Sequence, residues 1–242
     1  GLPLRNGRGG KPMNLAKNSI GRLVPLEIPG VGTFDPYGGA FNRILQSASR
    51  AAAHPVRKPE APSRSKVAPG LKAAIERSGL ENGMTISFHH HLRNGDAVIP
   101  QVLETLLQMG YRDLTFAPSS IPDSHDCVAD YVRKGLIRRI WTSGARGEVG
   151  RMISRGEMEE TVVIRSHGGR ARAIEEGSIA IDVAFLAAPA CDALGNSAGC
   201  SGKSACGSLG YAITDARFAR HVIAVTDNLV EYPLHPHISI PQ

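Results

Sequence analysis

The stretch from Met84 to Asp96, MTISFHHHLRNGD, carries the side chains best suited to chemistry in this 242-residue chain. Its apolar start predicts a strand, which is followed by three histidines, an arginine, an asparagine, a glycine and an aspartate. A helical pattern comes next, so imidazoles, a guanidinium and helix N-terminal amides would meet at the carboxyl end of a strand. Open α/β sheets bind ligands at that edge, and helix N-termini favour anions. The stretch therefore predicts a site for an anionic small molecule.

The consecutive histidines His89, His90 and His91 have more than one role open to them. Side chains alternate along an extended chain, so His89 and His91 would share one face and His90 the other. Zinc binding is one alternative, but no H-E-x-x-H motif or cysteine pair supplies further ligands, and we expect no metal. Purely structural histidines are another alternative. Because Arg93 and a helix start lie beside them, we favour anion binding or polarisation of a thioester carbonyl.

Two serines, Ser119 and Ser120, follow the predicted strand at 113–117. Their hydroxyls would line the same edge of the sheet, and capping of a helix is the alternative role. Neither serine stands in a G-x-S-x-G motif, so we do not expect a hydrolase nucleophile here.

A third polar segment, with His167, Gly168 and Gly169, follows the predicted strand at 161–165. Paired glycines let a ligand approach the backbone, whose N–H groups can hold an oxyanion. A tight turn without function is the alternative. Because this segment and the histidine segment both follow strands of one predicted sheet, we expect both at its carboxyl edge.

The cysteines and the glycine-rich run near them give weaker signals. The run from Gly195 to Gly207, GNSAGCSGKSACG, does not match the spacing of a phosphate-binding P-loop, so we predict a flexible loop or a contact with a carrier arm. None of the four cysteines forms a C-x-x-C pair, and we expect reduced thiols. Metal binding by Cys200 and Cys206 is the alternative.

Apolar runs alternate with helical patterns along the chain. Strands are predicted at 84–88, 113–117, 137–141, 161–165, 179–187 and 221–226. Helices are predicted at 97–109, 125–134, 148–154 and 210–219, and another begins near Lys72. This alternation predicts an α/β fold in which a mostly parallel sheet has helices on both faces.

The net charge of +6 is concentrated at the N-terminal end. Residues 1–77 contain 13 Lys and Arg against 4 Asp and Glu, whereas residues 78–242 contain 15 against 18. We expect residues 1–70 to form an irregular basic arm with a Pro-rich linker, and residues 71–242 to form the α/β domain. The arm would dock an acidic partner or remain a solvated tail, and a nucleic-acid groove in the α/β domain is disfavoured.

The chain contains no apolar run near the roughly 18 residues of a membrane helix. The first residues, GLPLRNGRGG, lack the apolar core of a signal peptide. We therefore expect a cytoplasmic protein with no membrane partner.

Several segments resemble one known family. The segments SFHHHLRNGD, DLTFAPSSI and AIDVAFLAAPACDALGN are similar to the alpha chain of citrate lyase, the citrate:acyl-carrier-protein transferase subunit. The N-terminal NSIGR and PGVGTFDPYGGAF also resemble that family's leader segment, so the similarity extends over roughly residues 18–233. It implies a coenzyme A transferase-like (NagB/RpiA-like) fold.

The resemblance also implies an activity. An acetyl thioester on an acyl carrier protein exchanges with citrate, acetate leaves and a citryl thioester forms, which a separate lyase chain cleaves to oxaloacetate. The implied partners are the carrier (gamma chain), the lyase (beta chain), citrate and further copies of this chain, with no nucleic acid. No cofactor would be held tightly by this chain, because the thioester belongs to the carrier's phosphopantetheine-derived arm, or to acetyl-CoA and citryl-CoA.

The same resemblance assigns roles to the polar segments. It implies catalytic roles for His89, His91 and Arg93. It implies substrate binding by a second group: His90, Asn94, Gly95, Ser119, Ser120, His167, Gly168 and Gly169. Citrate carries three carboxylates near neutral pH, and these cationic and N–H donors suit it.

Chains of this family contain two similar halves, and the present sequence is similar to the first. We therefore expect it to supply half of the active unit. The main alternative is a non-catalytic domain that senses a small anion or sugar phosphate on the same fold. A zinc hydrolase built on the histidines and a nucleic-acid binder acting through residues 1–77 are further alternatives.

Overall fold

The computed structural model describes residues 14–28, 31–36, 65–89, 97–234 and 240. The chain divides into two compact units, residues 1–49 and residues 50–242, and each is described by itself. In the first unit, β1 (Leu15–Lys17) pairs with β2 (Leu23–Pro25), and β3 (Glu27–Ile28) pairs with β4 (Gly32–Thr33), both antiparallel. Short hairpins thus occur within the segment that the sequence marks as irregular.

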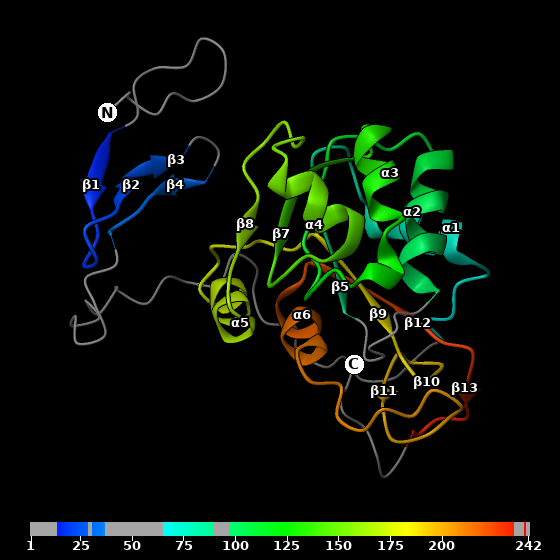
Figure 1. The fold of residues 1–242 in the computed structure, drawn as a ribbon. Coiled ribbons are helices and arrows are strands. Elements are labelled where there is room, and N and C mark those ends of the chain that lie inside the picture. Colours follow the sequence, from blue (N-terminus) through cyan, green and yellow to red (C-terminus); the bar gives the residue numbers. More distant parts are fainter. Residues whose placement is uncertain (1–13, 29–30, 37–64, 90–96, 235–239, 241–242) are drawn as a thin grey trace. The chain divides into compact units, whose positions relative to one another are not determined.

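The second unit is built on a six-stranded sheet with the order β12-β9-β5-β6-β7-β8 (Figure 1). All five neighbouring pairs are parallel. The strands are β5 (Thr85–His89), β6 (Leu114–Phe116), β7 (Ile137–Thr142), β8 (Val163–Ile164), β9 (Val183–Ala187) and β12 (His221–Val225). Each one falls within or overlaps a predicted strand, so the mostly parallel sheet is confirmed.

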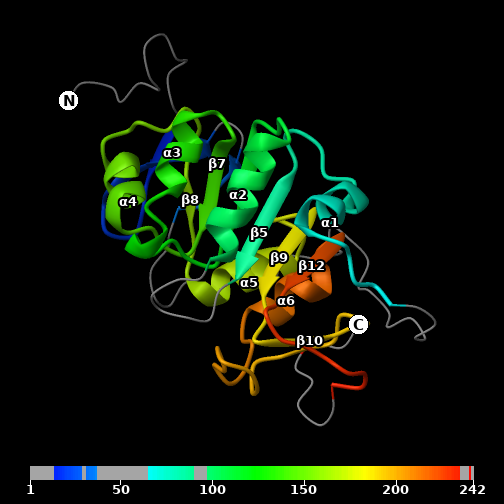
Figure 2. The ribbon, with the colours of Figure 1, turned by 90° about the vertical axis from the view of Figure 1, so that its right-hand side faces the viewer.

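Helices cover both faces of this sheet (Figure 1, Figure 2). Val183 and Phe185 of β9 belong to one apolar cluster, and Ala184 and Leu186 belong to another, as expected when successive side chains of a strand point to opposite faces. The first cluster includes residues of α1 (Leu71–Ser78), α2 (Val98–Gln108), α3 (Val128–Arg133) and α4 (Gly147–Ser154). The second includes residues of α5 (His167–Glu175) and α6 (Ala212–Phe218).

The central strands explain why the sheet is covered on both faces. Every residue of β5 and of β6 is buried, so neither strand has a solvent-facing side. Phe88 of β5 stacks on Phe185 of β9 at 5.1 Å between ring centroids and tilts against Phe116 of β6 at 5.3 Å. These rings fix the centre of the larger cluster.

A small three-stranded sheet lies beyond the main one, with the order β11-β10-β13. Its strands are β10 (Ala190–Asp192), β11 (Ser197–Ala198) and β13 (Leu229–Val230). A one-turn 3-10 helix, η1 (Asp123–His125), leads toward α3. Among the described helices, none combines the length and apolar character needed to cross a membrane.

Candidate active site

The strand order places His89 at the point where the chain reverses its direction across the sheet. From β5 the chain moves outward through β6, β7 and β8, and then returns to β9 on the other side of β5. Ligand crevices of open α/β sheets form at the carboxyl ends of the strands that flank such a switch point. His89 is the last residue of β5 and is aligned with Leu186 of β9.

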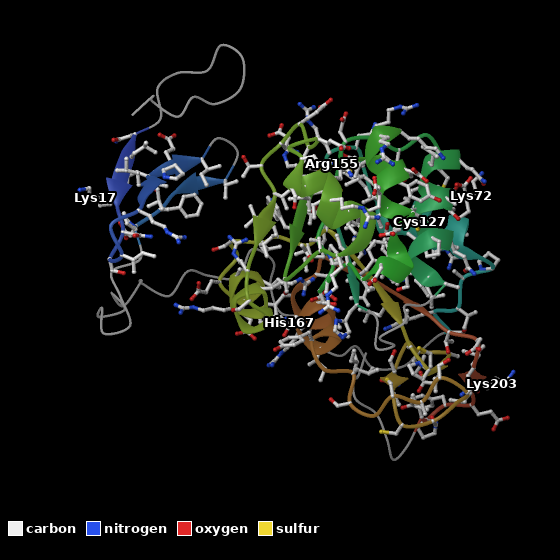
Figure 3. All side chains as sticks on the ribbon, viewed as in Figure 1. Lys17, Lys72, Cys127, Arg155, His167 and Lys203 are labelled. Atoms are coloured by element: carbon white, nitrogen blue, oxygen red, sulfur yellow. The ribbon has the colours of Figure 1, made fainter. Side chains whose placement is uncertain are left out.

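Three aromatic rings gather at this edge. Tyr211 immediately precedes α6, and its ring centroid lies 6.4 Å from that of His89 and 5.6 Å from that of His167. His89 is only 9% exposed, whereas Tyr211 is 37% exposed. In Figure 2 the arrowhead of β5 points toward α5 and α6, and Figure 3 labels His167 on α5 beside α6. The rings thus combine a buried imidazole with solvent-accessible partners.

The segment with His167, Gly168 and Gly169 forms the first turn of α5, where the paired glycines suggest a loop. Ser166 adopts an extended backbone before the helix, and its hydroxyl accepts a hydrogen bond from the Gly169 N–H at 3.0 Å. This N-cap satisfies one of the free amides of the first turn. Since a side chain at Gly168 would have no atom within 4 Å of its Cβ, the backbone there remains open to a ligand.

Ser119 lies beside the end of β5. It is 5% exposed, and its backbone N–H donates to the Phe88 carbonyl at 3.1 Å, while its carbonyl accepts from the Ser143 N–H at 3.2 Å. The segment after β6 is therefore held between the ends of two neighbouring strands. Ser120 is half-buried in the same segment.

A buried ion pair that the sequence did not predict lies behind these residues. Arg170 of α5 donates to both carboxylate oxygens of Asp215 of α6, each at 2.8 Å, and to the Ala117 carbonyl at 2.7 Å. Asp215 shares a helix face with the buried Ala212 and Ala216. An acid on an otherwise apolar stripe was the signal that could have indicated a buried partner.

Arg165 is a second cation that the predictions missed. It follows β8 and is half-buried, and none of the ion pairs between described residues includes it. Burial lowers the pKa of its guanidinium below the ordinary value. A guanidinium still stays protonated at neutral pH, so Arg165 is available to pair with an anionic ligand.

Five of the predicted residues fall outside the part of the chain that the structure describes. They are His90, His91, Arg93, Asn94 and Gly95. The described members, His89, Ser119, Ser120 and the start of α5, lie along the same edge. Among the described residues, no group of three or more His, Cys, Asp or Glu is arranged to hold a metal ion.

Comparison with known proteins shows the family. The model of the family "Citrate lyase, alpha subunit" matches residues 64–242. The chain belongs to this family. It is 53% identical over 171 residues to the citrate lyase alpha chain of Klebsiella pneumoniae, covering 71% of this chain and 34% of that one. It is 47% identical over 199 residues to the alpha chain of Haemophilus influenzae, covering 81% and 40%.

A solved structure of the same family is also similar. It is that of a Streptococcus mutans protein described as an alfa subunit of citrate lyase, in complex with citrate. The TM-score is 0.76 at 49% identity, and the match covers 82% of this chain and 39% of that one. The chain thus spans 34% to 40% of the lengths of these two curated relatives. The resemblance to the citrate lyase family and the coenzyme A transferase-like fold are confirmed.

Proposed function

We propose that this chain forms the first half of a citrate:acyl-carrier-protein transferase, which exchanges acetyl for citryl on a carrier thioester. The observation that carries this proposal is the meeting of His89, His167 and Tyr211 at the switch point of a chain from the citrate lyase alpha family. The citrate bound to the Streptococcus mutans protein supports the choice of acid.

The reaction needs cationic and N–H donors rather than a protein nucleophile. A citrate carboxylate attacks the acetyl thioester carbonyl, an oxyanion forms, and the thiolate leaves to give a mixed anhydride. The thiolate then attacks the citryl carbonyl and acetate leaves. Preorganised donors that face the oxyanion stabilise this step, and holding both reactants in place supplies much of the remaining rate.

The candidate residues would divide this task between them. The buried imidazole of His89, with His91 and Arg93 of the same segment, would act on the thioester carbonyl. Arg165 and the open backbone at the start of α5 would hold citrate carboxylates. The substrate-binding set comprises His90, Asn94, Gly95, Ser119, Ser120, His167, Gly168 and Gly169.

The proposal extends to the chain's organisation and partners. Residues 71–242 would form the transferase domain and residues 1–70 an arm that docks an acidic partner in the cytoplasm. The partners would be a carrier (gamma) chain, a lyase (beta) chain and further copies of this chain. The thioester arm, phosphopantetheine-derived or that of acetyl-CoA, would come from the carrier or from solution.

The test is release of acetate from an acetylated carrier protein plus citrate. We expect release when the second half of the transferase is supplied and none with this chain alone. No release in either case, with both proteins folded, would contradict the transferase and favour an anion-sensing domain. That alternative would be followed with a binding screen against small carboxylates and sugar phosphates.

Substitutions at the histidine segment test the site itself. His89→Ala and Arg93→Ala should each strongly lower the rate of acetate release while changing the unfolding midpoint little. His221→Ala is the matched control, because His221 begins β12 and so lies at the opposite, amino edge of the sheet. Wild-type release in both site variants would remove these residues from the site.

A further inference from the structure

A buried ion pair joins α5, which begins with His167, to α6, which directly follows Tyr211. Arg170 is 2% exposed and Asp215 is 0% exposed. Nη1 of Arg170 donates to Oδ1 of Asp215 and Nη2 donates to Oδ2, so the guanidinium and the carboxylate form a planar fork. Such a bidentate contact fixes orientation as well as distance. It therefore constrains α5 and α6 relative to each other.

Each partner of the pair lies about one helical turn from a ring of the site. Arg170 is three residues after His167 in α5, and Asp215 is four residues after Tyr211 at the start of α6. Residues three or four positions apart lie next to each other on a helix. A change in the fork would therefore be passed to the 5.6 Å contact between the two rings.

The pair also reaches the segment after β6. Nη2 of Arg170 donates to the Ala117 carbonyl at 2.7 Å, and Ala117 is two residues before the buried Ser119. Three separate segments that border the site, α5, α6 and the end of β6, thus meet at one guanidinium.

Stability alone does not account for this pair. Taking two charges out of water is costly, and well-packed apolar replacements of buried pairs are often neutral or stabilising. The Nε of Arg170 adds to that cost, since it is buried and has no hydrogen-bond partner among the described residues. What the fork provides over apolar packing is a fixed orientation.

We propose that Arg170 and Asp215 form a positioning pair, which holds His167 and Tyr211 in the arrangement that acyl exchange needs. The inference rests on the proposed transferase function. Neither charge would touch the substrate, because both side chains are buried. Their effect on the reaction is exerted through the residues that they orient.

The decisive variant replaces both charges by leucine, Arg170→Leu with Asp215→Leu, in the complete transferase with its carrier protein. We expect only a small change in the unfolding midpoint, because relief from burying two charges offsets the loss of the donor to the Ala117 carbonyl. We expect kcat for acetate release to fall on the order of 10²-fold, with a smaller change in KM for citrate. A crystal structure of the variant should show a separation of the His167 and Tyr211 rings different from 5.6 Å.

A conservative variant separates geometry from charge. Arg170→Lys keeps the charge, but an ammonium group cannot form the fork, so we expect no rescue of kcat. Arg138→Lys is the matched control, because Arg138 forms exposed pairs with Asp113 and Glu160, and we expect its kcat to be unchanged.

The positioning role is overturned if the double variant keeps wild-type kcat and the 5.6 Å ring separation. If the double variant does not fold, Arg170→Lys decides: wild-type kcat overturns the proposal, and a reduced kcat at an unchanged unfolding midpoint supports it. Absence of exchange in the parent enzyme would instead contradict the proposed function. The ring separation in the variants would then still test the positioning pair.

Discussion

Replacing Asp192 by asparagine tests how the small sheet is held beside the candidate site. Asp192 is 2% exposed and its carboxylate accepts four hydrogen bonds. Oδ1 accepts from the backbone N–H groups of Leu194 and Asn196 at 3.0 and 3.1 Å. Oδ2 accepts from the Asn196 side-chain amide at 2.8 Å and from the Leu234 N–H at 3.1 Å. One carboxylate thus ties β10 to the turn that follows it and to the segment after β13.

The expected magnitude follows from the number of donors that lose an acceptor. In Asp192→Asn one carboxylate oxygen becomes an NH₂ group, so two buried donors face another donor. Each orphaned buried donor costs about 1–3 kcal/mol, and we expect a loss of about 3 kcal/mol in the free energy of unfolding. Asp182→Asn is the matched control, since Oδ2 of the Asp182 carboxylate accepts the Thr85 N–H at 2.9 Å and the amide oxygen of asparagine can still do so. Its loss should stay below about 1 kcal/mol.

The difference in the free energy of unfolding between wild type and Asp192→Asn should also depend on pH. Burial raises the pKa of Asp192, but hydrogen bonds from the Asn196 side chain and from three backbone N–H groups outweigh it, so the pKa lies below its usual value. The stability that the charged carboxylate provides is therefore fully present above the unfolded pKa of about 3.9. It is lost as the pH falls from there through the folded pKa. Urea unfolding followed by circular dichroism across this range is the assay.

Two results would refute this reasoning. The first is that, at neutral pH, Asp192→Asn lowers the free energy of unfolding no more than Asp182→Asn does. The second is that the difference in the free energy of unfolding between Asp192→Asn and wild type stays constant as the pH falls well below 4, where an ordinary Asp becomes protonated.

Two further perturbations follow from the packing. Gly199→Ala should lower the free energy of unfolding by at least about 1 kcal/mol, because the new Cβ would lie 2.0 Å from the Gly207 carbonyl oxygen and overpacking forces backbone shifts. Gly168→Ala, whose Cβ would have nothing within 4 Å, should raise the free energy of unfolding instead. Urea unfolding that shows Gly199→Ala to be the more stable of the two variants would contradict this. Burial and the hydrogen bond to Glu104 raise the pKa of Tyr131 from 10.0 to about 12, so its contribution to stability is present below pH 10 and lost as the pH rises toward 12. In Tyr131→Phe the free energy of unfolding should fall less steeply between pH 10 and pH 12 than in wild type. An equally steep fall in the variant would exclude this tyrosine as its cause.

Most strands of the six-stranded sheet were predictable because they are short, mainly apolar runs bounded by polar or turn residues. The run from Met84 to Phe88 contains the start of β5, and the run at 113–117 contains β6. The histidine and serine segments could therefore be assigned to strand ends before the structure was known. Such patterns are local, and the features that the sequence missed are those that depend on distant residues.

The helix α5 shows this limit clearly. Gly168 and Gly169 are poor helix formers, and adjacent glycines ordinarily indicate a turn. The helix forms because Ser166 caps it and because Arg170 and Ile174, at 2% and 1% exposure, are buried on one face. Arg170 in turn depends on Asp215, 45 residues away, which no local pattern identifies as its partner.

Strand order explains why Tyr211 matters most among the missed residues. The sequence predicts His89 and His167 at one edge of the sheet, but β8 lies three strands from β5. Parallel strands are about 4.8 Å apart, so the ends of β5 and β8 are separated by about 14 Å. Two side chains at that distance do not form one site by themselves. The ring of Tyr211, just before α6, lies between the two histidines and is close to both imidazole rings. That position is fixed by the contact of α6 with α5, so the site is completed by helix packing and not by the strand ends alone.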